Sequence, residues 1–137
     1  MSVPEDLQYA LRRLELYVAP IEFHVIAAYL RGYDHCSSGG VLVGFREWLV
    51  VKLGFGNNFV WTELALRLIF PETDRPRESL ARPNGQEVAV KMLVELVEEF
   101  WRDREAPDGL RLIYLKYQKW LEHQSWYEPQ SPLYIAY

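Results

Sequence analysis

The 137-residue chain carries 15 basic and 19 acidic residues, which gives a formal net charge of −4 with neutral histidines. Its length is typical of one domain with one core, and a chain that is 50% hydrophobic and 25% charged is too apolar to stay disordered. An acidic balance without a dense basic cluster argues against nucleic acid, whose phosphates attract basic surfaces. We therefore expect a single folded domain, residues 1–137, that binds no nucleic acid.

The cysteine content and the N-terminus indicate the compartment. Cys36 is the only cysteine, so no internal disulfide can form, which is typical of a reducing environment. The first residues, MSVPEDLQY, lack the basic stretch and apolar run of a secretory signal. No segment approaches the roughly 20 uninterrupted apolar residues that a spanning helix needs. We expect a soluble cytoplasmic protein without a membrane anchor.

Two helices are predicted in the first 36 residues. Ser2 and Glu5 have the spacing of a capping box, and apolar residues then recur every three or four positions as far as Pro20, which ends the helix. In residues 21–36 the apolar side chains surround the helix instead of lining one side, which is typical of a central helix. The loop of residues 37–40, two serines and two glycines, follows.

The middle of the chain contains the most ambiguous segment. Residues 41–55, VLVGFREWLVVKLGF, fit a strand because of their four valines and a helix because of the spacing of their other apolar residues. A helix is the preferred interpretation, and the strand stays open as the alternative. Asn58 is expected to cap another helix over residues 59–70, which Pro71 ends.

The last third begins with residues 71–85, whose three prolines predict the longest irregular connection. A helix is predicted over 86–104, and a second one follows the Pro-Asp-Gly turn at 107–109. The tail, residues 126–137, holds two prolines and four aromatic residues. The sequence thus predicts an all-α domain, a bundle of about six helices with an extended aromatic C-terminal tail. Whether the tail docks on its own domain or on a partner stays open.

Few residues are suited to metal binding or catalysis. The histidines are His24, His35 and His123, and His35 only adjoins Cys36, so their side chains point about 100° apart on a helix. Cys36 is interpreted as a small buried apolar residue instead of a nucleophile. No glycine-rich segment has the pattern of a phosphate or dinucleotide loop. We expect no metal, no cofactor and no catalytic residue.

An acidic stripe is predicted on the helix over residues 86–104. Glu95 and Glu99 lie one turn apart on one flank, and Glu98 and Arg102 lie on another. A hydrolase dyad is conceivable there, but no His, Lys or second carboxylate helix is spaced to complete a site, which favours a solvated face. The same stripe would also suit docking to a basic partner.

Aromatic residues are unusually frequent, with five Trp, nine Tyr and six Phe. Three of them, Trp48, Trp61 and Phe100, fall on apolar helical faces and are expected in the core. Aromatic residues beside loops or in the tail can either pack on the domain or anchor an interface; these are Tyr33, Trp126, Tyr127, Tyr134 and Tyr137. The candidate partner-binding residues are therefore Glu95, Glu98, Glu99, Tyr33, Trp126 and Tyr134.

Two segments carry a resemblance to known proteins. The segments YLRGY, at 29–33, and GFREW, at 44–48, resemble those of small uncharacterised bacterial proteins, some of which are similar to immunity partners of polymorphic toxins. The resemblance covers residues 29–70. It implies a protein that neutralises a toxin domain by binding it and has no catalytic activity, and it offers no established functional residue to carry over.

The preferred function is a non-enzymatic protein-binding module, an immunity or antitoxin-like protein if the resemblance holds. One alternative is a sensor that holds a small ligand in an aromatic-lined pocket between helices, which requires a cavity. The other is an enzyme without a recognisable motif, which requires a cleft with strongly perturbed carboxylates. An adjacent gene for a large secreted toxin would favour the first reading. The partner's identity and the oligomeric state stay open.

Overall fold

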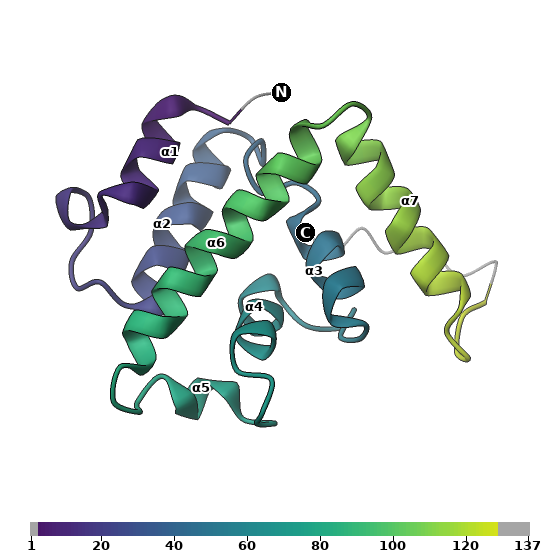
Figure 1. The fold of residues 1–137 in the computed structure, drawn as a ribbon. Coiled ribbons are helices and arrows are strands. Elements are labelled where there is room, and N and C mark those ends of the chain that lie inside the picture. The colour runs from purple at the N-terminus through teal and green to yellow at the C-terminus, as the bar shows by residue number, and fades with distance from the viewer. Residues whose placement is uncertain (1–2, 129–137) are drawn as a thin grey trace.

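The computed structural model describes residues 3–128, and Figure 1 shows helices joined by turns. Within that range there are seven α-helices, one 3-10 helix and no strand, so the predicted all-α fold is confirmed. The predicted aromatic tail lies mostly in residues 129–137, outside the described residues, and so does Tyr134. The helices are α1 (Glu5–Arg12), η1 (Leu14–Leu16), α2 (Phe23–Cys36), α3 (Phe45–Leu53), α4 (Trp61–Ile69), α5 (Pro76–Ser79), α6 (Gly85–Glu105) and α7 (Gly109–Glu122).

The longest helix, α6, organises the bundle. Figure 1 shows it crossing the molecule diagonally, with α1 and α2 on one side, α3 and α4 on the other, and α7 beside α3 at the far end. Leu93, Val97 and Phe100 are fully buried on α6, at the three- and four-residue spacing that makes one apolar stripe. Burying each large side chain of this kind stabilises the fold by about 1.5–3 kcal/mol.

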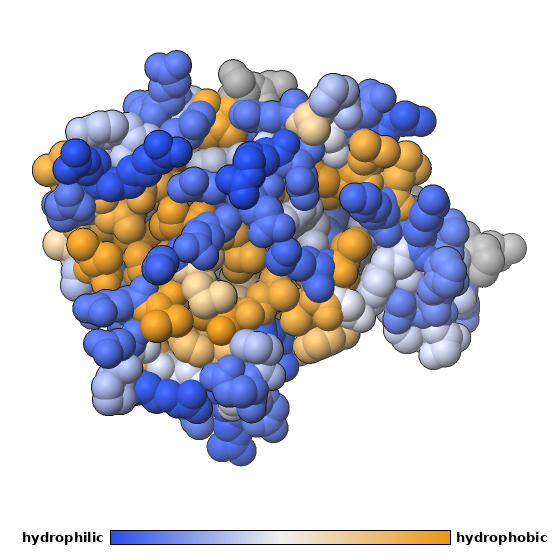
Figure 2. Space-filling model, viewed as in Figure 1, coloured by the Kyte–Doolittle hydropathy of each residue, from blue (hydrophilic) through white to orange (hydrophobic). Residues whose placement is uncertain are grey.

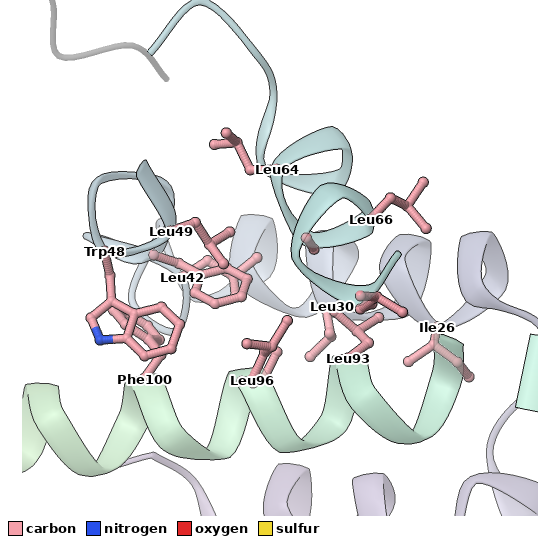
Figure 3. Packing of buried hydrophobic residues seen from close by; sticks show 14 of the residues in the cluster. Ile26, Leu30, Leu42, Trp48, Leu49, Leu64, Leu66, Leu93, Leu96 and Phe100 are labelled. Carbon is pink, nitrogen blue, oxygen red and sulfur yellow. The ribbon is translucent and has the colours of Figure 1, made fainter. Parts of the chain in front are cut away.

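The core lies where α6 meets α2, α3 and α4. Figure 3 shows Leu93, Leu96 and Phe100 pointing from α6 into this space. The rings of Trp48 and Phe100 meet edge to face, with centroids 5.9 Å apart. The prediction that these two rings belong to the core is confirmed, and Trp61 is partly buried against the same cluster.

The ambiguous segment 41–55 is helical only from Phe45 onward. Val41 and Leu42 lie in a buried turn whose backbone N–H groups donate to Asp34 Oδ1 over 3.2 and 2.7 Å. Gly44 has a φ of +88°, which L side chains rarely adopt, and an added Cβ would lie 2.8 Å from Leu110 Cδ1. Residues 41–44 are therefore a turn held by the Asp34 carboxylate, and Phe45–Leu53 form α3, which contains the other two valines.

The helix boundaries of the first segment differ from those predicted. The helix α1 ends at Arg12, because Arg13 adopts a non-helical φ of −137° and ψ of 51°, and η1 follows. The N-cap is Pro4, with no side-chain cap, so the described chain has no capping box, and Ser2 lies outside it. The single predicted helix is therefore split into two short ones.

Two other boundary predictions were wrong. The N-cap of α4 is Val60 instead of Asn58, so the helix begins two residues later than expected and has no side-chain cap. The connection 71–85 contains the short helix α5, which begins with Pro76, a residue whose fixed φ suits a first helical turn. These differences account for the extra helix beyond the expected six.

Buried polar groups fix the end of α6 to the turn before α3. The indole N–H of Trp101 donates to the carbonyl of Val41 over 2.9 Å, and Arg104 Nη1 donates to the carbonyl of Gly40 over 3.0 Å. Both side chains are buried, so these bonds form where water does not compete for them. No helix among residues 3–128 has the length and apolar character needed to cross a membrane.

Candidate functional site

The predicted acidic stripe on α6 is divided among different surroundings. Glu99 Oε1 lies 2.9 Å from Lys52 Nζ on α3, whereas Glu98 lines a pocket between α1 and α6. Glu95 is exposed and has no ion-pair partner among residues 3–128. Figure 2 shows hydrophilic residues running along α6 with hydrophobic side chains on both sides. The three glutamates therefore differ in their surroundings, and their role in partner binding stays a prediction.

A groove of about 290 Å³ lies between α3, α6 and α7. The indole N–H of Trp48 donates to Asp103 Oδ2 over 2.8 Å, and Lys52 Nζ lies 5.1 Å from the centroid of the same ring. Because Lys52 also pairs with Glu99, both carboxylates of the groove already have protein partners. Lys116 also lines the groove, so its lysines and carboxylates are equal in number.

A second cluster of aromatic residues was not predicted. Tyr9, Tyr17, Tyr29 and Tyr33 follow one another across α1, the segment after η1, and α2, and we call them the tyrosine surface. Ring centroids of successive tyrosines lie 6.4, 6.4 and 6.5 Å apart, the first pair edge to face and the others tilted. Such contacts restrict the rings, and Tyr9 and Tyr17 stay exposed while Tyr29 and Tyr33 are partly buried.

The tyrosine surface is both accessible and apolar. Tyr9 is 51% exposed and Tyr17 46%, and the neighbouring Leu16 is 65% exposed and Ile21 44%. Large apolar side chains in water forfeit the stabilisation that burial would give, so a group of four on adjoining segments calls for an explanation. Protein interfaces are enriched in tyrosine, whose ring gives a large contact area at a low cost in conformational entropy.

Hydroxyl groups anchor one end of the tyrosine surface to α1. The Tyr33 hydroxyl donates to Asp6 Oδ1 over 2.9 Å. Burial raises the pKa of Tyr33 and of Tyr29 above the usual value, and the negative charge of Asp6 adds to both shifts. The raised pKa of Tyr33 agrees with its hydroxyl acting as the donor to Asp6.

A smaller pocket, of about 190 Å³, lies between the N-terminal segment and α6. Arg12 and Gln8 line it from α1, and Arg102 and Glu98 line it from α6. The backbone N–H of Val3 donates to Oε1 of Glu105, which also lines the pocket, over 2.7 Å. Both guanidinium groups lack an ion-pair partner among the described residues.

The other candidate residues lie apart from the acidic helix and from one another. Tyr33 belongs to the tyrosine surface on α2, whereas Trp126 follows α7, which Figure 1 places at the opposite side of the molecule. The Trp126 ring is exposed and meets Trp120 edge to face at 6.3 Å. The Trp120 indole N–H in turn donates to the carbonyl of Gly54 over 3.2 Å.

The prediction that Cys36 is buried was wrong. It occupies the last turn of α2 and is exposed, because the buried face of that helix is made by Phe23, Ile26, Ala27 and Leu30. No group of three or more His, Cys, Asp or Glu among residues 3–128 is placed to hold a metal ion.

Part of the missed site carried a signal in the sequence. Tyr29 and Tyr33 stand four apart on one helical flank, and Tyr9 lies off the apolar stripe of α1 formed by Leu7 and Leu11. An aromatic residue on the polar side of an amphipathic helix is the observation that points to a surface role. The position of Tyr17 between α1 and α2 required the structure. No protein family, curated protein or solved structure matches the chain in comparisons with known proteins.

Proposed function

We propose that this protein is a non-enzymatic protein-binding module whose binding face is the tyrosine surface together with Leu16 and Ile21. The observation that supports it is the chain of tyrosine rings, accessible at Tyr9 and Tyr17 yet held by contacts between neighbours. Rings that are already ordered lose less conformational entropy when a partner covers them. The surface therefore has the composition and the order of an interface centre.

Charges near the tyrosine surface suggest which partner it suits. The exposed carboxylates of Glu5, Glu15 and Glu22 flank it along the chain, and none has an ion-pair partner among the described residues. Arg13 is an exposed cation one turn beyond Tyr9. The excess of acidic groups favours a partner with a basic rim, which would also associate faster at low salt. A toxin domain, as in the resemblance to immunity proteins, is the partner we propose.

Site-specific photocrosslinking in cells that produce the protein tests this function. A photoreactive phenylalanine analogue replaces Tyr17 in one variant and Val60, an equally accessible apolar residue after α3, in the matched control. We expect one crosslinked partner from position 17 and none from position 60. An equal pattern from both positions, or none from position 17, would count against the tyrosine surface as the binding face.

A further inference from the structure

The pocket between α1 and α6 is lined by charged groups that form no ion pair within the described chain. Elsewhere, arginines such as Arg67 and Arg77 contact a carboxylate, and Arg104 donates to a backbone carbonyl. Arg12 and Arg102, one from each helix, instead line the same pocket without an ion pair among residues 3–128. The pocket therefore presents uncommitted guanidinium groups, which bind carboxylates well.

Carboxylates of the same pocket also have free capacity. Glu98 has no ion-pair partner among residues 3–128. Glu105 uses Oε1 to accept the backbone N–H of Val3, while no partner of Oε2 is found in the described chain. These oxygens can accept hydrogen bonds from an ammonium group. The pocket thus offers positively charged hydrogen-bond donors and negatively charged acceptors.

The remaining lining residues are Gln8, whose side-chain amide donates to the carbonyl of Val3 over 3.0 Å, and two apolar residues. Val3 and Trp101 are buried residues that line the pocket, and the indole N–H of Trp101 is already bound to the carbonyl of Val41. The indole therefore contributes its hydrocarbon surface to the wall. A volume of about 190 Å³ is below the range of drug-sized ligand sites, about 300–1,000 Å³, so only a small molecule fits.

We propose that this pocket binds a small zwitterion, a free α-amino acid with an apolar side chain. Its carboxylate is held by Arg12 and Arg102, its ammonium by Glu98 and Glu105, and its side chain rests on the apolar wall. A plain anion would face two glutamates and a plain cation would face two arginines, so a ligand that carries both charges is favoured over either.

This ligand site is distinct from the tyrosine surface, although both include α1. Gln8 and Arg12 face the pocket, whereas Tyr9 lies on the other flank of the same helix. A ligand bound to Arg12 and Arg102 bridges α1 to α6. Bound amino acid therefore slows hydrogen exchange of the α1 amides, because a ligand that binds only the folded state suppresses local opening.

Titration of the full-length protein with L-leucine, followed by amide NMR spectra, tests the proposal. We expect saturable shifts confined to Val3, α1 and the C-terminal half of α6. Two analogues separate the charges: 4-methylpentanoate lacks the ammonium group and 3-methylbutylamine lacks the carboxylate, so each should bind at least about tenfold more weakly. Equal binding of either analogue, or no saturable shift up to tens of millimolar leucine, would overturn the proposal.

Variants assign the binding to these side chains. Arg102→Gln and Glu98→Gln change exposed or half-exposed groups of α6, and each should weaken leucine binding at least about tenfold. Lys91→Gln, on an exposed part of the same helix outside the pocket, is the control and should leave the affinity unchanged. Thermal melting checks that all three variants fold. Wild-type affinity in both pocket variants contradicts the proposed contacts.

Discussion

At the scale of single residues, Glu47 is the most unusual side chain of the core. It is only 5% exposed, and burial raises the pKa of its carboxyl, although Arg46 and a hydrogen bond from Tyr114 act in the opposite direction. Arg46 Nη1 lies 3.5 Å from Glu47 Oε2, which is at the long end for an ion pair. The ionised carboxylate is thus incompletely compensated inside the protein.

We predict that Glu47 makes the folded state less stable as pH rises. A carboxyl whose pKa is higher in the folded than in the unfolded state contributes stability below the unfolded pKa and loses it as pH rises through the folded pKa. Glu47→Gln, which has nearly the same shape and no charge, should therefore gain stability over the wild type as pH increases. Urea unfolding of both proteins at a series of pH values measures the difference between their free energies of unfolding. Carboxylates that titrate alike in the two proteins cancel from this difference. A difference independent of pH would show that Glu47 does not carry this linkage.

At the core, Leu93 is the residue on which the packing of α6 depends most directly. It is fully buried in the cluster that α6 forms with α2 and α4. Leu93→Ala should lower the free energy of unfolding by about 2–5 kcal/mol, because it removes buried methyl groups and leaves a cavity. Val88→Ala, on an exposed position of the same helix, is the control and should change it by less than about 1 kcal/mol. If denaturant unfolding showed equal losses of unfolding free energy in the two variants, the central role of Leu93 in the core would be contradicted.

At the scale of elements, two glycines in helices should respond oppositely to alanine. An added Cβ at Gly32, in α2, meets no atom within 4 Å, whereas at Gly109, the first residue of α7, it would lie 2.2 Å from the carbonyl oxygens of Asp103 and Arg104. Gly32→Ala should stabilise the protein by about 0.5–1 kcal/mol, since alanine favours the helix. Gly109→Ala should destabilise it by about 1–3 kcal/mol, because the turn between α6 and α7 must open. Calorimetric melting that ranks the two variants the other way would contradict this account of the turn.

The elements also show what sequence patterns can and cannot predict. Residues 85–105 form a long helix as predicted, because three- and four-residue apolar spacing extends over many turns and the packing agrees with it. In 41–55 the preferred helix is confirmed over Phe45–Leu53, whereas residues 41–44 form a turn, because Asp34 accepts the backbone N–H groups of Val41 and Leu42, seven and eight residues further along the chain. The predicted helix ends were also imprecise, since α4 begins after Val60 without a side-chain cap and the backbone leaves helical geometry at Arg13.

At the scale of the whole molecule, the tyrosine surface depends more on the chain reversing its direction than on any sequence motif. Tyr9 and Tyr17 come together with Tyr29 only because the chain turns back between η1 and α2 and brings α1 alongside. Sequence periodicity describes one helix at a time and does not say which flanks of two helices adjoin. The acidic stripe illustrates the same limit, since Lys52, forty-seven residues away along the chain, neutralises Glu99.

The central claim is that the tyrosine surface binds a protein partner, and the affinity of the crosslinked partner for a double variant tests it most directly. Tyr9→Ala with Tyr17→Ala removes the two most exposed rings of the tyrosine surface, so the melting temperature should change little. Calorimetric titration should show binding weakened by about 100-fold or more, as expected when two central aromatic anchors are lost. Wild-type affinity in the folded double variant would contradict the account.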